Sequence, residues 1–359
     1  MKKILFISTY GISLYDSNLD VPFGGAEIQF YMLSNKLKKK GYSVFIFTGD
    51  FGQENFTTKE GVNVIKTFKL KGIFNKLFAP FKLFKSLYKL QPSFIFCRAN
   101  GMELGVAGFY RFFFKVNLIY MGAHDFDSTG EHFKGLVGAF FKFGLAKSDL
   151  ITAQNSFQKD NFSKFFPGKK IILFNNLFEM RLPSKSTRDY ILWVGRADVK
   201  KRPEIFLDVV KKFPEEKFMM IMPKSSNEKY YYSIRKEALS LNNLQFVERV
   251  NFSKIQKYFD KSKLFLCTSS SEGFPNTYIQ SGISSTPIVS LSLDPNFVFR
   301  DYSIGFNAKG SWSLFLDKIY LLLNDSLLWE KYSKNAYTYV RNNHDVEEGI
   351  SILEDELLK

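Results

Sequence analysis

The residues with the clearest chemical potential lie between positions 269 and 282, directly after the apolar run 264–267. An apolar run, small polar residues with a glycine, and then Pro275 at an expected first helical position indicate a strand, a loop and a helix start. The backbone amides of Asn276 and Thr277 would have no partner inside that helix. Together with the helix dipole they can bind a phosphate, so the segment predicts an anion site.

Glu272 and Gln280 flank this predicted anion site. Glu272 precedes the helix start, and Gln280 lies four residues beyond Asn276 on the same helical face. One acid and one amide beside a phosphate suit a ligand that carries hydroxyl groups on both sides of its phosphate, such as a nucleotide-sugar. A loop with an exposed glutamate is the alternative interpretation of this segment alone.

A second basic cluster follows the apolar run 190–194, where Gly195-Arg196 precedes Lys201-Arg202-Pro203. Arg196 offers a forked guanidinium and Lys201 a mobile point charge. Together they suit a diphosphate that gains charge as it leaves. Pro203 is expected to open the next helix. A solvated basic loop is the alternative.

The first half of the chain contributes paired glycines and a histidine. Gly24-Gly25 before a helix would let the backbone come close to a ligand, although the spacing is not that of a dinucleotide fingerprint. His124, just past the run 116–120, can donate to a sugar hydroxyl or an oxyanion. We expect no metal at Asp125 and Asp127, since no acidic pair ends a strand and no His/Cys cluster has ligand spacing.

These groups need a scaffold that brings them together. Continuous apolar runs alternate with amphipathic helical segments, which predicts parallel sheets covered on both faces. The fold class is therefore α/β, with two doubly wound, Rossmann-like domains whose strand ends face a central cleft. Residues 312–359 are expected to be largely helical, with a cap at 324–326. The predicted strands are 4–8, 43–48, 94–97, 116–120, 150–153, 171–174, 190–194, 218–222, 244–247, 264–267 and 287–291.

Composition agrees with two soluble domains. The chain has 359 residues, of which 45% are hydrophobic, and this is too long for one ordinary core. A formal net charge of +15 points to an anionic partner: nucleic acid, an acidic membrane surface or a phosphorylated substrate. Cys97 and Cys267 each end an apolar run, so we expect reduced core residues and a reducing compartment. No apolar run approaches the roughly 20 residues of a membrane span.

The motifs together resemble the family 4 retaining glycosyltransferases of GT-B fold, and the likeness covers nearly the whole chain. It is carried by Gly195-Arg196 with 201–203, 272–276 with Gln280, 286–289, 24–27, 294–295 and 304–306. The expected organisation is an acceptor-binding domain over 1–180, a linker over 181–189, and a donor-binding domain over 190–340. A C-terminal helix over 341–359 is expected to cross back to the first domain.

The resemblance implies a role for each residue of the motifs. Arg196 and Lys201 would hold the donor diphosphate, Glu272 would contact the donor sugar, and His124 would touch the transferred sugar. Gln280 replaces the glutamate that usually binds the ribose hydroxyls, and an amide can still accept from one hydroxyl and donate to another. Further donor-binding residues would be Gly24, Gly25, Gly195, Gly273, Phe274, Pro275, Asn276 and Thr277.

A basic, aromatic stretch follows in the first domain, where no acidic residue occurs between Glu60 and Glu103. With Pro80 as the expected first helical residue, Phe81, Phe84 and Tyr88 recur at helical spacing. Lys82, Lys85 and Lys89 follow on a neighbouring face, and a basic amphipathic helix is typical of membrane-surface binding. A packed helix with solvated lysines is the alternative. Nucleic acid is not expected, because no known nucleic-acid module is present.

The sequence therefore predicts a metal-independent, retaining glycosyltransferase without a cofactor. It would move a hexose-type sugar from a UDP- or GDP-linked donor to a lipid-linked or polysaccharide acceptor. We expect it in the cytoplasm, attached to the inner face of the membrane. Three alternatives stay open: a nucleotide-sugar binding protein with little turnover, an epimerase, and a sugar phosphorylase of the same fold.

Overall fold

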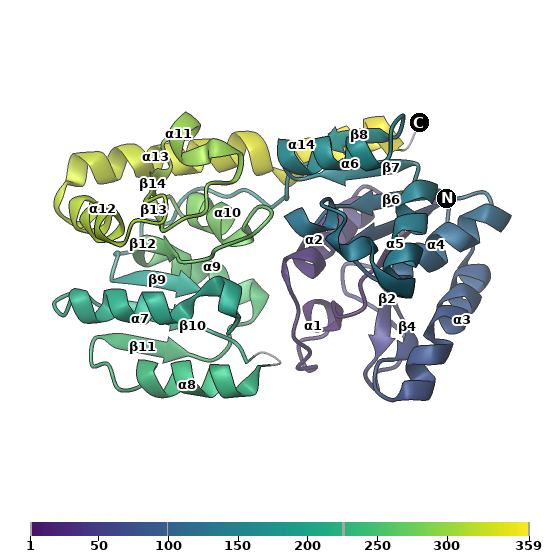
Figure 1. Ribbon diagram of the computed structural model, residues 1–359, viewed down its shortest axis with the longest axis horizontal. Coiled ribbons are helices and arrows are strands. Elements are labelled where there is room, and N and C mark those ends of the chain that lie inside the picture. Colours follow the sequence, from purple (N-terminus) through teal and green to yellow (C-terminus); the bar gives the residue numbers. More distant parts are fainter. Residues whose placement is uncertain (1, 99, 225–226, 358–359) are drawn as a thin grey trace. The chain divides into compact units, whose positions relative to one another are not determined.

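In the computed structural model the chain forms two compact units, and residues 2–98, 100–224 and 227–357 are described. The first unit comprises Met1–Glu179 with Val346–Lys359, and the second comprises Met180–Asp345. Each unit contains one sheet with helices against it (Figure 1).

The first unit alternates strands and helices along the chain. Its elements are β1 (Lys3–Ile7), α1 (Ile12–Tyr15), α2 (Gly25–Lys39), β2 (Ser43–Asp50), β3 (Phe56–Thr57), β4 (Asn63–Lys69), α3 (Ile73–Leu90), β5 (Phe94–Arg98), α4 (Met102–Phe113), β6 (Asn117–Met121), η1 (Asp125–Asp127), η2 (Glu131–Phe133), α5 (Gly135–Lys147), β7 (Leu150–Ala153), α6 (Ser156–Phe165), β8 (Lys170–Leu173) and α14 (Val346–Leu357).

The second unit repeats this alternation. Its elements are β9 (Tyr190–Val194), η3 (Val199–Lys201), α7 (Pro203–Lys212), β10 (Phe218–Ile221), α8 (Glu228–Ala238), β11 (Leu244–Val247), α9 (Phe252–Asp260), β12 (Ser262–Cys267), α10 (Asn276–Ile283), β13 (Ile288–Ser290), η4 (Pro295–Phe297), α11 (Val298–Tyr302), β14 (Gly305–Asn307), α12 (Trp312–Asn324) and α13 (Ser326–His344).

The first sheet has the strand order β3-β4-β2-β1-β5-β6-β7-β8 and is parallel except for the pair β3–β4. Alternate residues of β1 face opposite sides, so Leu5 packs with α3, α4 and α5, and Phe6 packs with α2 and α14. The strands are therefore buried on both faces, which is why their sequences are continuously apolar.

The second sheet has the order β11-β10-β9-β12-β13-β14, and all its pairs are parallel. Leu264 and Leu266 of β12 pack toward the side of α7, α8 and α12. Phe265, between them, contacts Phe259 of α9 and Tyr278 of α10 on the other side. The prediction of an α/β fold with two Rossmann-like sheets is confirmed.

The segment 181–189 has no helix or strand and is tied to the second unit. Arg181 pairs with Asp260, and Arg188 donates to the Ser262 carbonyl at 2.9 Å and to Thr286 Oγ1 at 2.6 Å. At the other end of the chain, α14 belongs to the first unit, where it packs on α2. The chain thus leaves the first unit once and returns to it once.

Three short or polar strands were not predicted: β3, β4 and β14. β4 mixes polar and apolar residues without strict alternation, and Lys66 and Lys69 lie in this strand. The expected start of α3 at Pro80 is wrong, because the helix begins at Ile73 and Pro80 lies inside it. Pro275 is the N-cap of α10, one residue before the expected position of a helical proline.

Both cysteines are buried and free. Burial raises the pKa of the Cys97 thiol well above its ordinary value, so at neutral pH Cys97 is a core thiol and not a thiolate. None of the described helices is long and apolar enough to span a membrane.

Helices α4 and α5 are held together by glycines. A Cβ at Gly144 would lie 2.6 Å from the Leu104 carbonyl oxygen, and a Cβ at Gly108 would lie 3.0 Å from the Gly144 Cα. The two backbones are therefore in direct contact, and no side chain fits between them.

Gly144→Ala should lower the free energy of unfolding by about 1–3 kcal/mol, because the added methyl group would force two buried backbones apart. Chemical denaturation measures this change. Ala139→Ser, at an exposed position of the same helix, should change the free energy by no more than about 0.5 kcal/mol. Equal effects of the two substitutions would contradict the close contact.

Candidate functional site

The loops that follow β9 and β12 are joined by hydrogen bonds. These strands are neighbours in a parallel sheet, so both loops begin at the same end of the sheet. The Trp193 indole donates to Thr268 Oγ1 at 2.9 Å, and that hydroxyl donates to the Lys201 carbonyl at 2.6 Å. The Ser270 amide donates to the Lys200 carbonyl at 2.8 Å. The two predicted motifs of the second unit therefore form one cluster.

Arg202 joins the same loops through its side chain. Its guanidinium donates to the Thr268 carbonyl at 2.6 Å, the Ser269 carbonyl at 3.3 Å and Ser292 Oγ at 3.0 Å, the last of which follows β13. The residue has a φ of +49°, a left-handed conformation that favours glycine. An arginine at this strained position fits a positioning role for the loops.

Lys201 and Glu272 form an ion pair at the centre of the cluster. Their side chains keep 25% and 18% exposure, so the pair is partly shielded and still reachable from solvent. A carboxylate acceptor and an ammonium donor thus stand side by side, able to contact a ligand that carries both hydroxyl groups and negative charge.

Arg196 is exposed, and none of the described residues bonds to its side chain. The preceding Gly195 has a local structural reason, because a Cβ there would lie 2.8 Å from the Trp193 ring. Gly195 therefore lets the indole reach Thr268. Arg196, in contrast, is available to a ligand.

The start of α10 lies directly after Glu272. Gly273, Phe274 and Pro275 are buried, whereas Asn276 and Thr277 of the first turn are partly exposed. Phe274 packs against Tyr278 and His344, with ring centroids 6.2 Å and 4.7 Å apart. The predicted helix start therefore exists, and aromatic packing fixes its position.

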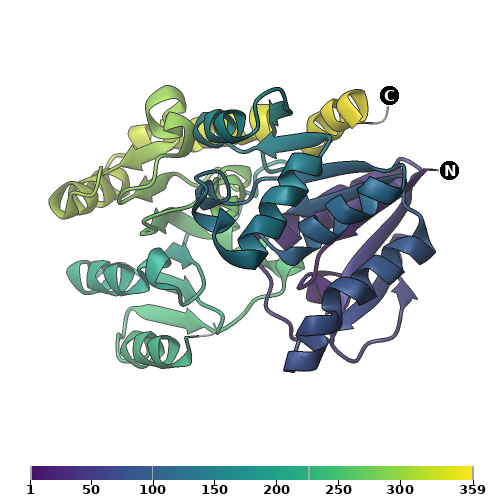
Figure 2. The same ribbon diagram turned by 45° about the vertical axis from the view of Figure 1, so that its right-hand side comes forward.

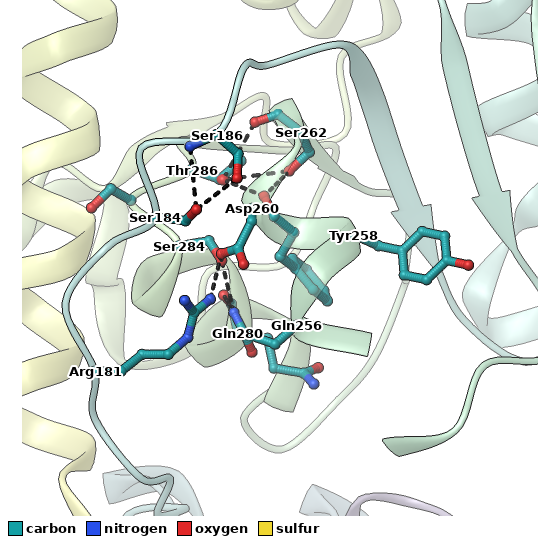
Figure 3. A network of polar contacts seen from close by, with 12 residues as sticks. Arg181, Ser184, Ser186, Gln256, Tyr258, Asp260, Ser262, Gln280, Ser284 and Thr286 are labelled. Carbon is teal, nitrogen blue, oxygen red and sulfur yellow. Dashed lines mark hydrogen bonds and ion pairs between the residues drawn. The ribbon is translucent and has the colours of Figure 1, made fainter. Parts of the chain in front are cut away.

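Gln280 lies one turn further along α10 and is only 5% exposed. Its backbone carbonyl accepts from Gln256 Nε2 at 2.7 Å, and the same nitrogen donates to Ser284 Oγ at 2.8 Å. Figure 3 shows this contact beside Asp260, whose carboxylate accepts from Ser284 Oγ at 2.6 Å and pairs with Arg181. These contacts hold α10 against α9, and burial leaves little of the Gln280 side chain for a ligand.

Gly24 and Gly25 lie at the start of α2 in the first unit. Gly24 is the N-cap, and its amide donates to Glu27 Oε2 at 2.8 Å. A Cβ at Gly24 would meet only that carboxylate oxygen, at 3.3 Å, so the backbone here is open to an approaching group.

His124 follows β6 and caps η1. Its Nδ1 accepts from the Phe126 amide at 3.3 Å, and its ring stacks on Phe126 with a centroid distance of 4.8 Å. Asp127 accepts from the Ala123 and His124 amides, and Asp125 accepts from Asn155 and Gln158 at 2.9 Å. Asp127 is therefore used within the loop, and Asp125 ties the loop to the start of α6. His124 Nε2 has no hydrogen-bond partner among the described residues.

A cavity of about 170 Å³ opens at the ends of β1 and β5 beside the start of α2. Its lining includes Thr9, Glu27, Arg98 and Glu103, with Glu103 accepting from Thr9 Oγ1 at 2.7 Å. Arg98 donates to Asn176 Oδ1 at 2.7 Å, while its Nε has no partner among the described residues. Burial lowers the pKa of Arg98 to about 10, so the guanidinium stays charged at neutral pH.

The sequence patterns missed Arg202, Thr268 and this cavity. Arg202 stood within the basic motif, and its residue type alone gave no sign that it binds carbonyl groups. The only sequence signal for Thr268 is its position directly after a predicted strand. Arg98 ends β5 and would have been found by asking which charged residues end buried strands.

Residues 177–339 match the family model of glycosyl transferases group 1. No curated protein matches the sequence. HepE of Anabaena in complex with UDP and glucose is 16% identical, with a TM-score of 0.76 over 99% of each chain. Sucrose-phosphate synthase from Thermosynechococcus elongatus is 14% identical, with a TM-score of 0.80 over 100% of this chain and 99% of that one.

The chain has the GT-B fold. A mutant TarM of S. aureus in complex with UDP, fondaparinux and a GlcNAc-glycerol is also similar. It is 19% identical, with a TM-score of 0.61 over 83% of this chain and 65% of that one. The GT-B likeness therefore extends over both units, whereas the family model covers the second unit and its boundary.

Arg202→Gly should loosen the loop after β12 while the backbone keeps its left-handed conformation. Loss of a charged hydrogen-bond donor costs about 1.5 kcal/mol or more, which corresponds to roughly tenfold faster hydrogen exchange at the Ser270 amide. Arg196→Ala is the matched control and should leave this exchange unchanged. Unchanged exchange in Arg202→Gly would remove its positioning role.

Proposed function

We propose that this protein is a retaining, metal-independent glycosyltransferase. It transfers a hexose-type sugar from a UDP- or GDP-linked donor to a lipid-linked or polysaccharide acceptor. The observation that carries the proposal is the Lys201–Glu272 ion pair, with the exposed Arg196 in the same loop as Lys201, in a segment that matches the model of glycosyl transferases group 1.

The donor diphosphate binds Arg196 and Lys201. Two cations suit two phosphoryl groups, and none of the described residues pairs with the Arg196 side chain in competition with a phosphate. Glu272 accepts from hydroxyl groups of the donor sugar, and the amides at the start of α10 contact sugar or phosphate. Gln280 contributes at the ribose only through the small part of its side chain that reaches the surface.

UDP is the nucleotide favoured by the related structures. HepE is described with UDP-glucose and with UDP, and a structure from E. coli described as trehalose-6-phosphate is bound with UDP-2-fluoro glucose. Their likeness to this chain supports a nucleotide-sugar of this class as the donor. No cofactor takes part, since the donor itself is a co-substrate.

Catalysis rests on stabilising the leaving group. As the bond between the sugar and the diphosphate breaks, the diphosphate takes the electron pair, and preorganised cations lower the energy of that charge. Glu272 is held by Lys201, and a second carboxylate for a double displacement is not evident in the cluster. As the resemblance to retaining glycosyltransferases implies, the acceptor oxygen bonds to the anomeric carbon from the face on which the diphosphate departs. It gives its proton to the leaving phosphate oxygen, and the anomeric configuration is retained.

The acceptor binds the first unit, at the cavity between β1, β5 and α2. Glu27 and Glu103 can accept from sugar hydroxyls, and Arg98 can donate to them, a mixed lining that suits a neutral glycan. His124 contributes Nε2 near the end of β6, two strands from β1 in the sheet, and touches the transferred sugar.

The site of action is the cytoplasmic face of a membrane, where a lipid-linked acceptor or a growing polysaccharide is presented. Lys82, Lys85 and Lys89 are exposed on α3 and face solvent in the first unit. Their positive charge attracts the protein to anionic lipid, with each lysine worth about 1 kcal/mol near the surface.

Arg196→Ala should lower the turnover of sugar transfer by about 100-fold to 1,000-fold, because a preorganised charge at the leaving group is lost. Release of nucleoside diphosphate in the presence of acceptor measures turnover. Arg341→Ala, at an exposed arginine of α13, is the matched control and should transfer at the wild-type rate. The thermal stability of both variants should equal that of the wild type.

The same assay separates the competing functions. A donor that binds in calorimetry but is never consumed indicates a binding protein without turnover. Conversion of the donor sugar without release of nucleoside diphosphate indicates an epimerase, and dependence on inorganic phosphate indicates a phosphorylase. Wild-type turnover in Arg196→Ala would remove the role assigned to that residue.

A further inference from the structure

Helices α3, α4 and α5 lie side by side over one face of the first sheet (Figures 1 and 2). The outer side of such a layer is usually polar, because water faces it. Here it is aromatic and aliphatic. On α3 the exposed apolar residues include Ile73 at 79% and Phe74 at 74% of their full exposure, and Phe81 at 71%. The core stripe of α3 is a different one, formed by Ala79, Leu83, Leu87 and Leu90.

Aromatic contacts join the outer side of α3 to that of α4. Phe84 of α3 contacts Phe109 of α4 with a centroid distance of 5.8 Å, and Phe109 contacts Phe113 at 5.1 Å. Lys147 of α5 lies 5.5 Å over the ring of Phe112. We call this outer surface of α3, α4 and α5 the aromatic face. At its α5 end, Leu136 is 92% exposed.

The aromatic face is also strongly basic. Its only acidic residue on the three helices is Glu103, which turns inward to accept from Thr9. Asp149, just after α5, is paired with Arg111. The exposed lysines of the three helices are Lys76, Lys82, Lys85, Lys89 and Lys142.

The opposite side of the same unit differs. There α14 carries Glu347, Glu348 and Glu354, and lysines of α2 pair with Glu347 and Glu354. Lysines on that side therefore have acidic partners on a neighbouring helix, whereas α3, α4 and α5 carry no acidic residue other than Glu103.

We infer that the aromatic face docks on an anionic lipid bilayer, with its apolar side chains inserted between headgroups and its lysines against them. Charge decides the occupant: a basic rim around an apolar centre complements a surface that is anionic outside and apolar beneath. The inference rests on the proposed function. It adds the surface that would bring the enzyme to a lipid-linked acceptor.

Two signals act together in this docking. Insertion of a few side chains or attraction of a few lysines alone gives marginal binding, and the two combined give reversible attachment that weakens with salt. This predicts stronger binding to vesicles of phosphatidylcholine with phosphatidylglycerol than to phosphatidylcholine alone. It also predicts that α4 and α5 contribute, although the basic run of the sequence ends before them.

The test is sedimentation with these two vesicle types at low and high salt. Charge reversal of Lys82, Lys85 and Lys89 to Glu should lower the partition coefficient at least about 100-fold, since each lysine contributes about fivefold. The triple change Phe74→Ser, Phe78→Ser and Phe81→Ser should lower it by at least about tenfold. The matched control reverses Lys254, Lys257 and Lys334, which are exposed in the second unit, and should bind as the wild type does.

A second variant keeps the test decisive if the triple serine protein does not fold. Leu136→Ser with Val137→Ser changes two exposed positions at the first turn of α5 and should also weaken sedimentation. Wild-type sedimentation by either folded serine variant would overturn the role of insertion. A wild-type protein that does not sediment with anionic vesicles at low salt would overturn the whole inference.

Light scattering without lipid tests the competing occupant, a second copy of the chain. A dimer that the serine variants disperse, together with no vesicle binding, would overturn the inference and assign the aromatic face to self-association. Release of nucleoside diphosphate with a short soluble acceptor keeps the two proposals apart. Vesicle binding without any sugar transfer removes only the proposed function, and transfer without vesicle binding removes only the docking.

Discussion

Covering both faces of a parallel sheet is the constraint on which both units depend. Each strand has apolar residues on both sides, so helices must lie on both faces of the sheet. Every crossover must then return the chain to the end of the sheet where the strands begin. The loops that follow the strands therefore all lie at the other end of the sheet, beside the carboxyl ends of the strands, whatever their sequence. This explains why the cation of the loop after β9 meets the carboxylate of the loop after β12, although 71 residues separate Lys201 from Glu272.

In the second unit, side-chain hydrogen bonds also hold the loops in place. Trp193, Thr268 and Arg202 use side chains to satisfy loop carbonyl and hydroxyl groups that no strand partner reaches. Arg188 does the same at the other end of the sheet, where burial lowers the pKa of its guanidinium and four carbonyl oxygens surround it. Buried cations of this kind remain charged because the backbone solvates them in place of water. The ion pair of the candidate site is thereby held on loops that have little freedom to move.

The buried strands could be predicted from the sequence because burial on both faces requires a continuous apolar run, as in Tyr190–Val194. Sequence reasoning missed Asn63–Lys69, whose mixture of polar and apolar residues lacks that signature, and Gly305–Asn307, which is too short to show one. It misplaced the start of α3 because proline favours a first helical position, while the two turns before Pro80 carry no capping signal. Periodicity also left open which apolar stripe of that helix faces the core. The role of Arg202 could not be predicted, because it depends on contacts with residues far away in the chain. Arg98 could have been singled out by its place at the end of a buried strand, but its contact with Asn176 could not.

The glycine contact between α4 and α5 affects how fast the aromatic face would associate with a membrane. Helices whose backbones touch at Gly108 and Gly144 cannot slide past each other without losing close packing, so they form a rigid plate. Many amphipathic segments fold only when they meet a membrane and lose conformational entropy at that moment. A plate that is already folded meets no such barrier. Its lysines would then set the rate of encounter through long-range attraction, and its aromatic side chains would set the residence time, so that evolution could tune the two independently.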